Sequence, residues 1–417
     1  MIGTNWRAIG LTVVHKAFPS QPGVAADPFD PFTLPAAGSR FTFYPRGADR
    51  LEALIELIEG AHDTLDAFYF EYDPDETGIR MRDALVAAAR RGVRVRLYVD
   101  AFGSGAQPDF FSDLVDAGGT FNRFQARWNI RFLIRNHQKM AIADGERVMS
   151  GGFNIADAYF APPQDFGWTD LGVRIEGALT QRFAAWFALI HEWMTADGSE
   201  FRRIRSLVRD WDGGEGPVQL LLGGPTTVTS SWARAFKRDL VHSERTDIVT
   251  AYFSPPRSVR RALRRAARHA RLRMILARWS DAQITVRAAR LHYKRMVRNG
   301  AALFEYLPTK LHMKLIILDN VAYIGSGNLD MRSVRLNLEL MIRVEDAPIA
   351  DRLRVLIDAL EAESRPVDSA WLAEHGGVVN RLRSLWASAM MRFVDYKLAR
   401  SLNLGAPSRA NTRAHED

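Results

Sequence analysis

Two short motifs in this chain place an imidazole beside an ammonium group. They are His137-Gln138-Lys139 and His312-Met313-Lys314. In an extended strand, residues i and i+2 point to the same face, so each histidine and its lysine should line one surface. Each motif is followed by an aspartate and then by an asparagine in a glycine-rich turn: Asp144 and Asn154 in the first half, Asp319 and Asn328 in the second. The sequence therefore predicts the same set of polar side chains twice.

Two such sets suit chemistry at a phosphodiester. The negative charge of a phosphodiester repels nucleophiles, and the two lysines and two asparagine amides can neutralise its non-bridging oxygens without a metal. One imidazole can then attack phosphorus while the other protonates the departing oxygen. The roles reverse when an acceptor hydroxyl resolves the phosphohistidine intermediate. We therefore expect a group transfer that uses no metal and no cofactor.

Transfer requires one neutral and one protonated imidazole, and the neighbouring lysines push both imidazoles towards the neutral form. A carboxylate beside each histidine would oppose this effect. Asp170 and Glu339 follow the two motifs by comparable distances along the chain. We predict that each accepts the Nδ1 proton of the histidine in its own half, Asp170 from His137 and Glu339 from His312, and so fixes the tautomer.

The motif aspartates stand apart from these two carboxylates. Asp144 and Asp319 lie at predicted strand ends, immediately before Gly145 and Asn320. A carboxylate at such a position commonly closes a turn. We keep both aspartates among the catalytic residues that the motif predicts, and we interpret their role as more structural than chemical.

The elements that must position these motifs occur in the same order in both halves. Apolar and alternating runs predict strands and helices in turn before each motif. In the first half these are strands at 41–44, 64–72 and 93–100 and helices at 48–60 and 78–91; in the second they are strands at 247–253 and 272–277 and a helix at 258–271. An internal duplication explains this order. It predicts an α/β protein of two pseudo-symmetric domains with the active site at their interface.

The length of 417 residues also exceeds the size at which a single hydrophobic core usually stops growing. Composition suggests four segments. They are an irregular lead-in at 1–39, a first domain at 40–210, a second domain at 211–365, and a basic amphipathic helix with a tail at 366–417.

Charge and composition restrict the partners and the chemistry. The net charge of +8 favours an anionic partner, which nucleic acid, anionic lipid or a phosphorylated small molecule would each satisfy. The absence of cysteine excludes disulfides, thiolate metal sites and cysteine nucleophiles. Near the N-terminus the longest apolar run, residues 9–14, is far shorter than the roughly 20 residues of a spanning helix, and no signal-peptide layout is present. We expect a soluble or peripheral chain.

The paired motifs resemble the double HKD signature of the phospholipase D superfamily: His-x-Lys, four residues, Asp, and then a Gly-[Gly/Ser]-x-Asn turn. Within that superfamily the chain is most similar to bacterial cardiolipin synthases of the short type, which lack N-terminal transmembrane helices. The segments that carry this likeness are 87–93, 251–255 and 325–333. Two departures stand out, because Gly152 replaces the usual serine and the second half has one residue fewer between Asp319 and Gly325.

The resemblance implies transfer of a phosphatidyl group from phosphatidylglycerol or a similar phospholipid to a lipid or polyol hydroxyl. It implies His137 as nucleophile and His312 as acid/base partner. The catalytic set is then His137, Lys139, Asp144, His312, Lys314 and Asp319, with Asn154 and Asn328 binding phosphate and Asp170 and Glu339 orienting the histidines. The implied partners are an anionic phospholipid and a membrane surface rather than nucleic acid, on the cytoplasmic face of a bacterial inner membrane. The oligomeric state is left open.

Other interpretations stay open at this level. A phospholipase D that hydrolyses lipid to phosphatidic acid, a superfamily nuclease, and a pseudoenzyme that only binds membranes would share the motifs. The helix expected around Val379, Leu382, Trp386, Ala389, Phe393 and Tyr396 is either a cap docked on its own domain or a membrane-surface helix. The arginine-rich helix at 260–273 is either a solvated face or an anion-binding flank.

Overall fold

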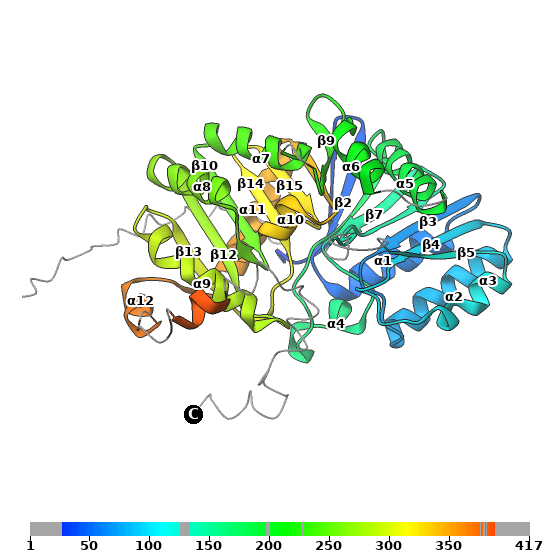
Figure 1. Cartoon of the computed structure of the whole chain (residues 1–417), viewed down its shortest axis with the longest axis horizontal. Helices are drawn as coiled ribbons and strands as arrows, with labels where there is room; N and C mark the ends of the chain where they lie inside the picture. The colour runs from blue at the N-terminus through cyan, green and yellow to red at the C-terminus, as the bar shows by residue number, and fades with distance from the viewer. Residues whose placement is uncertain are drawn as a thin grey trace, which may run out of the picture.

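The computed structural model describes residues 27–125, 134–196, 201–226, 229–375, 377, 380 and 382–387. Within these residues the chain forms two eight-stranded mixed sheets that lie side by side, one from each half of the sequence (Figure 1). The α/β fold of two pseudo-symmetric domains is therefore confirmed.

The first sheet has the strand order β1-β2-β8-β7-β6-β3-β4-β5. Its strands are β1 (Phe32–Ala36), β2 (Ser39–Tyr44), β3 (Thr64–Tyr69), β4 (Arg94–Asp100), β5 (Thr120–Phe124), β6 (Met140–Ala143), β7 (Arg147–Gly151) and β8 (Gly172–Gly177). Strands β3, β4 and β5 are parallel, whereas β6 pairs antiparallel with β3 and with β7. The first His-x-Lys motif thus enters the middle of the sheet.

The second sheet repeats this arrangement in the order β18-β13-β12-β10-β14-β15-β17-β9. Its strands are β9 (Val218–Gly223), β10 (Arg245–Thr250), β12 (Arg271–Trp279), β13 (Ala302–Lys310), β14 (Lys314–Leu318), β15 (Val321–Gly325), β17 (Glu339–Glu345) and β18 (Ser364–Pro366). Strand β14, which carries the second motif, pairs antiparallel with β10 and β15, as β6 does with β3 and β7. A separate pair joins β11 (Phe253–Ser254) to β16 (Leu329–Asp330).

Three large clusters of buried side chains hold these layers together. One lies on the α1 and α2 side of the first sheet and includes Leu57, and another lies on the α7 and α8 side of the second and includes Leu263. The third joins both sheets with α5 and α11 through residues such as Phe183, Leu340 and Leu353. The helices are α1 (Gly47–Glu59), α2 (Glu76–Arg90), η1 (Pro108–Phe111), α3 (Ser112–Asp116), α4 (Asp157–Phe160), η3 (Pro163–Asp165), α5 (Thr180–Thr195), α6 (Phe201–Asp210), α7 (Ser231–His242), α8 (Arg257–His269), α9 (Gln283–Val297), α10 (Met331–Arg335), α11 (Ala347–Ala362) and α12 (Ser369–His375). The shared core fixes the two halves against each other.

The expected irregular lead-in at 1–39 is wrong for its last part. Strand β1 pairs antiparallel with β2 through a hairpin in which Ala37 and Gly38 both have positive φ. The ring of Phe32 stacks on that of Phe43 at 4.8 Å between centroids. The proline in β1 is tolerated because this is an edge strand. The same proline argues against a strand when the sequence is considered alone, so the strand was not predicted. Residues 1–26 lie outside the described part.

The two basic helices differ in how much of them is seen. Helix α8 buries Val259 and Leu263 against its sheet and leaves Arg261 and Arg265 exposed, an arrangement that both interpretations of this helix require. Of the expected C-terminal helix, residues 382–387 are described; Leu382 and Trp386 are 61% and 60% exposed. Val379, Ala389, Phe393 and Tyr396 lie outside the described residues.

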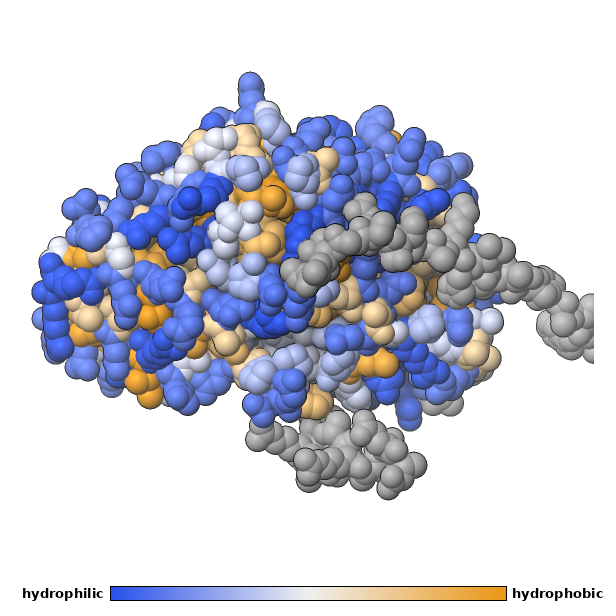
Figure 2. Space-filling view, turned by 180° about the vertical axis from the view of Figure 1, so that it is seen from behind, coloured by the Kyte–Doolittle hydropathy of each residue, from blue (hydrophilic) through white to orange (hydrophobic). Residues whose placement is uncertain are grey.

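Among the described residues that Figure 2 shows, no extended apolar belt appears on the face opposite to that of Figure 1. Hydrophilic residues predominate there, and the apolar ones form small separate groups (Figure 2). In the described part of the chain, no helix combines the length and the hydropathy needed to cross a bilayer.

Candidate active site

The two His-x-Lys motifs lie where β6 and β14 begin, and both histidines and both lysines are buried. Each of these central strands is followed by a hairpin strand that ends in the glycine-rich turn of its half, after β7 and after β15. The sequence folds this way because apolar runs form the strands and the turn residues end them. The structure thus brings the predicted histidines, lysines and asparagines to the same edge of each sheet.

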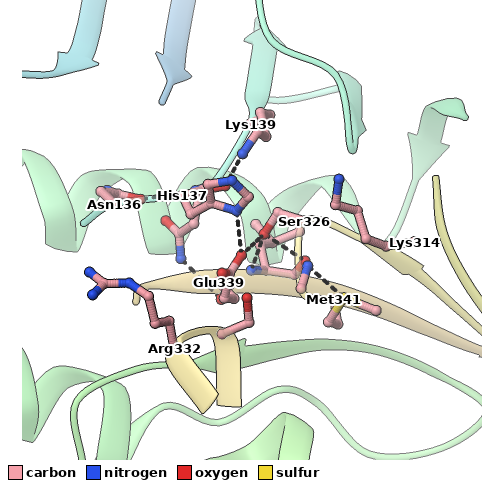
Figure 3. Close-up of polar contacts among 12 residues, drawn as sticks. Asn136, His137, Lys139, Lys314, Ser326, Arg332, Glu339 and Met341 are labelled. Atoms are coloured by element: carbon pink, nitrogen blue, oxygen red, sulfur yellow. Dashed lines mark hydrogen bonds and ion pairs between the residues drawn. The ribbon is translucent and has the colours of Figure 1, made fainter. Parts of the chain in front are cut away.

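The carboxylates pair with the histidines across the two halves. The Nδ1 of His137 lies 3.0 Å from the Oε2 of Glu339, and the Nδ1 of His312 lies 2.7 Å from the Oδ2 of Asp170. The predicted pairing within each half is therefore wrong. Both carboxylates are buried and accept the Nδ1 proton, so the Nε2 of each imidazole is left for chemistry. Figure 3 shows Glu339 beneath the ring of His137.

Backbone hydrogen bonds between the halves explain the exchange of partners. The amide of His137 donates to the carbonyl oxygen of Leu338 at 2.9 Å, and the amide of His312 donates to that of Thr169 at 2.8 Å. Each carboxylate residue directly follows one of these acceptors in the chain. Each histidine is consequently held by backbone and side chain of the opposite domain, and neither half-site is complete alone.

Burial controls the charges of the site. It lowers the pKa of His312 to about 3, with Lys314 adding to the effect, and it also lowers the pKa of His137. It lowers the pKa of Lys314 to about 8 and that of Lys139 well below its usual range. Lys314 also acts on His137 and Lys139 on His312, so the charges of the two halves share one environment. An anionic phosphate would raise all four pKa values and favour the protonated imidazole that transfer requires.

The lysines are held close to their own motifs. The Nζ of Lys139 donates to the carbonyl oxygen of His137, and that of Lys314 donates to the carbonyl oxygen of His312. In Figure 3, Lys139 lies above the group around Glu339 and Ser326, and Lys314 lies to its right. Among the described residues, no group of three or more His, Cys, Asp or Glu side chains has an arrangement that could hold a metal ion.

Comparison with known proteins fits this geometry. A family model described as "Cardiolipin synthase, PLD-like domain" matches residues 54–189 and 238–360. The chain belongs to this phospholipase D-like family. Cardiolipin synthase A of Pseudomonas fluorescens is 31% identical over 343 residues, which cover 79% of this chain and 70% of that protein. The major cardiolipin synthase of Bacillus subtilis is 30% identical over 319 residues, 74% of this chain and 66% of that one.

A solved structure supports the fold independently. The phosphatidylserine synthase of Haemophilus influenzae superposes with a TM-score of 0.67 and covers 87% of this chain and 94% of that chain. Its sequence is 14% identical, so the likeness concerns the fold alone. The two-domain arrangement of this family member therefore recurs in a distant protein.

The structure places the two motif aspartates outside the site. Asp144 accepts backbone hydrogen bonds from His62, Asp63 and Thr64, and Asp319 accepts them from the strand start at 244–245. At about 3.3 Å per residue of strand, Asp144 lies about 16 Å along the chain from Lys139. Both aspartates have positive φ, 56° and 49°, which aspartate tolerates in turns. Their inclusion in the catalytic set is corrected: they close turns that fix the neighbouring strands.

The two asparagines of the family motif are not equivalent. The Nδ2 of Asn154 donates to the hydroxyl of Tyr159 at 2.8 Å and to Glu71 at 3.4 Å. Neither the Oδ1 nor the Nδ2 of Asn328 has a partner among the described residues, although its side chain is fully buried. A buried amide without partners costs free energy, so Asn328 is poised to bind a ligand oxygen.

The second residue of each glycine-rich turn also differs. The hydroxyl of Ser326 donates to the Oε2 of Glu339 at 2.6 Å, in the middle of the group drawn in Figure 3. At Gly152, a Cβ would lie 2.4 Å from the Oδ1 of Asp170. The first departure from the family motif therefore has a reason: Asp170 occupies the space that a serine would need.

Several positioning residues were not predicted. Asp100, at the end of β4, accepts the backbone N–H of Asn136 at 2.9 Å, and burial raises the pKa of this carboxyl to about 6. The buried guanidinium of Arg50 donates to the carbonyl oxygens of Tyr159 and Asp170, at 2.6 Å each. For Asp100 the sequence did offer a signal, because this carboxylate stands at the end of a predicted strand. Nothing in the sequence distinguishes Arg50 from the other arginines of the chain.

Proposed function

We propose that this protein is a cardiolipin synthase-like transphosphatidylase. It transfers a phosphatidyl group from phosphatidylglycerol or a similar phospholipid to a lipid or polyol hydroxyl. The single observation that carries the proposal is the crossed pair of contacts, His137 with Glu339 and His312 with Asp170, in a chain of this family. Two oriented imidazoles facing one phosphorus supply both the nucleophile and the acid that a two-step transfer needs.

In the first step the Nε2 of His137 attacks the phosphorus, and His312 protonates the departing glycerol oxygen. A phosphorus–nitrogen bond forms and the phosphorus–oxygen bond to the headgroup breaks. In the second step His312 takes the proton of an acceptor hydroxyl, whose oxygen attacks phosphorus and releases His137. In this proposal Lys139, Lys314 and Asn328 stabilise the charge on the non-bridging oxygens.

The decisive experiment uses purified protein with phosphatidylglycerol vesicles and resolves the lipid products. We expect cardiolipin as the main product, and equal turnover with and without a chelator. Phosphatidic acid as the main product would make the protein a hydrolase. No turnover of lipid together with cleavage of nucleic acid would replace the proposal by a nuclease.

The same proposal includes peripheral attachment to an anionic bilayer. The net charge of +8 supports it, since each basic residue near such a surface contributes about 1 kcal/mol. The exposed Leu382 and Trp386 are suited to shallow insertion. We expect the protein to co-sediment with phosphatidylglycerol vesicles. Added salt should weaken this binding, and so should the double substitution Leu382→Ser and Trp386→Ser. Attachment to the cytoplasmic face of an inner membrane stays a prediction, which protease accessibility in spheroplasts would check.

A further inference from the structure

A second group of polar side chains lies against His312 and has no part in the two-step transfer. We call it the acid–tyrosine cluster: Glu71, Asn154, Tyr159, Tyr252 and Asp281. The hydroxyl of Tyr159 donates to the Oε2 of Glu71 at 3.1 Å, and that of Tyr252 donates to the Oδ1 of Asp281 at 3.0 Å. Both tyrosine rings meet His312 edge-on, with centroids at 5.1 and 6.5 Å.

The two tyrosines connect the carboxylates to His312, since each tyrosine contacts its ring and donates to one carboxylate. Burial raises the pKa of Tyr159 well above its usual value, and Glu71 and Asp281 both add to this effect, so the two carboxylates act on the same phenol. Glu71 also favours the ammonium form of Lys139, and Asp281 that of Lys314. The cluster therefore adjoins both halves of the site.

Carboxylates at this place are unfavourable for binding a phosphate, because like charges repel. They are well suited to a neutral ligand that donates hydrogen bonds, since a carboxylate accepts up to about four. Glu71 and Asp281 are both partly exposed, whereas Asn154, Tyr159 and Tyr252 are buried. The carboxylates are thus the members of the cluster that an entering molecule would reach.

We propose that the acid–tyrosine cluster selects a polyol as the acceptor, with Glu71 as its main specificity-determining residue. This inference rests on the proposed transphosphatidylase function. Glu71 and Asp281 accept hydrogen bonds from the hydroxyls of a glycerol headgroup that do not react. The remaining hydroxyl gives its proton to His312 and its oxygen attacks phosphorus, while the phosphorus–nitrogen bond breaks and its electron pair returns to His137.

A competition between two acceptors tests the proposal, because both draw on one phosphohistidine intermediate. Deuterium-labelled glycerol and 1-propanol are offered together to the enzyme on phosphatidylglycerol vesicles. Mass spectrometry measures the ratio of labelled phosphatidylglycerol to phosphatidylpropanol. In Glu71→Gln we expect this ratio to fall at least tenfold relative to the unmodified protein, since a site built for hydroxyl groups rejects analogues that lack them. The matched control is Glu52→Gln, which changes an exposed carboxylate of α1.

The ratio separates acceptor choice from catalysis. A general loss of rate in Glu71→Gln with an unchanged ratio would overturn the proposal. Tyr159→Phe is the second variant, because it removes the hydroxyl that donates to Glu71 and keeps the ring on His312. We expect a smaller shift in the same direction. If the unmodified protein released neither phosphatidyl product nor phosphatidic acid, the proposed function itself would fail, and not only this inference.

Discussion

The two half-sites share one backbone plan and differ in the groups that meet the substrate. In both, the lysine donates to the carbonyl of its histidine and the motif aspartate closes a turn. In the first half the asparagine is held by Tyr159 and the turn has Gly152. In the second, Asn328 has no hydrogen-bond partner within the described part of the chain, and Ser326 donates to the Glu339 carboxylate. The two halves therefore share a scaffold and differ in a few side chains, which is consistent with separate tasks for the two histidines.

The aromatic surroundings differ in the same way. The ring of His312 meets Tyr159 and Trp168 edge-on at 5.1 and 5.0 Å, whereas that of His137 has Phe70 at 4.9 Å. Tyrosine carries a hydroxyl that phenylalanine lacks, so among the described residues the aromatic surroundings of His312 are the more polar. This difference fits the assignment of His312 as the acid/base partner that handles leaving and accepting hydroxyls.

The largest expected effect comes from replacing the histidine that each half-site contains. His137→Ala and His312→Ala should each lower turnover by about 10⁴-fold, because either change removes one of two groups that transfer needs. Lipid-product assays measure the loss. Denaturation at alkaline pH, where the phosphorus–nitrogen bond of a phosphohistidine is stable, followed by peptide mapping, then separates the two roles: we expect the phosphatidyl group on His137. A label on His312 would reverse the assignment.

The asparagines should respond in opposite ways. Asn328→Ala is expected to lower kcat by about 100-fold, which is typical of losing one preorganised donor, with little change in stability. Asn154→Ala should instead destabilise the protein by about 1–3 kcal/mol, since it leaves the buried Tyr159 hydroxyl with one partner fewer. Steady-state kinetics and chemical denaturation measure both variants. Equal losses of kcat and no loss of stability would contradict the difference between the half-sites.

Substitutions at the second residue of each glycine-rich turn should have a smaller effect. Ser326→Ala removes a hydrogen bond to the Glu339 carboxylate, about 1.5 kcal/mol or roughly tenfold in rate if it is lost in the transition state. Gly152→Ser should be more harmful, because its Cβ would meet Asp170 at 2.4 Å and displace the partner of His312. The measurement is kcat for both variants beside their melting temperatures. A harmless Gly152→Ser would show that Asp170 has room to move.

The sequence was sufficient for the fold and for most of the site. The periodic apolar runs predicted strands and helices that the structure places within a few residues, such as β4 and α8. Spacing alone identified His137 and Lys139 with their counterparts. These features are local, since residue periodicity and motif spacing are properties of short stretches of chain.

What failed to be predicted depends on contacts between the halves. Asp170 and Glu339 were recognised as the carboxylates, but each was assigned to the wrong histidine because separation along the chain says nothing about an interface. The pairing is set by the bridges Asn136–Leu338 and Thr169–Leu311, which form only when both domains are folded. Likewise, the motif makes Asn154 and Asn328 look alike, and only the position of Tyr159 distinguishes them.

The smallest expected effect is the pH dependence of kcat/KM, and it concerns Lys314. Burial lowers the pKa of Lys314 to about 8 from the usual value near 10.5. The ammonium is therefore present below about pH 8 and is lost above it, while an ordinary exposed lysine would keep its charge to about pH 10. We expect kcat/KM, which reports the free enzyme, to fall severalfold between pH 8 and 9.5, with kcat less affected because bound phosphate raises the pKa of Lys314. Folding should not explain the fall, since a lysine whose pKa is lowered in the folded state gains stability as pH rises from 8 to 10.5. A pH profile with a soluble short-chain phosphatidylglycerol measures both kcat and kcat/KM. A kcat/KM that stays level to pH 10 would mean that Lys314 does not supply the charge that binds phosphate.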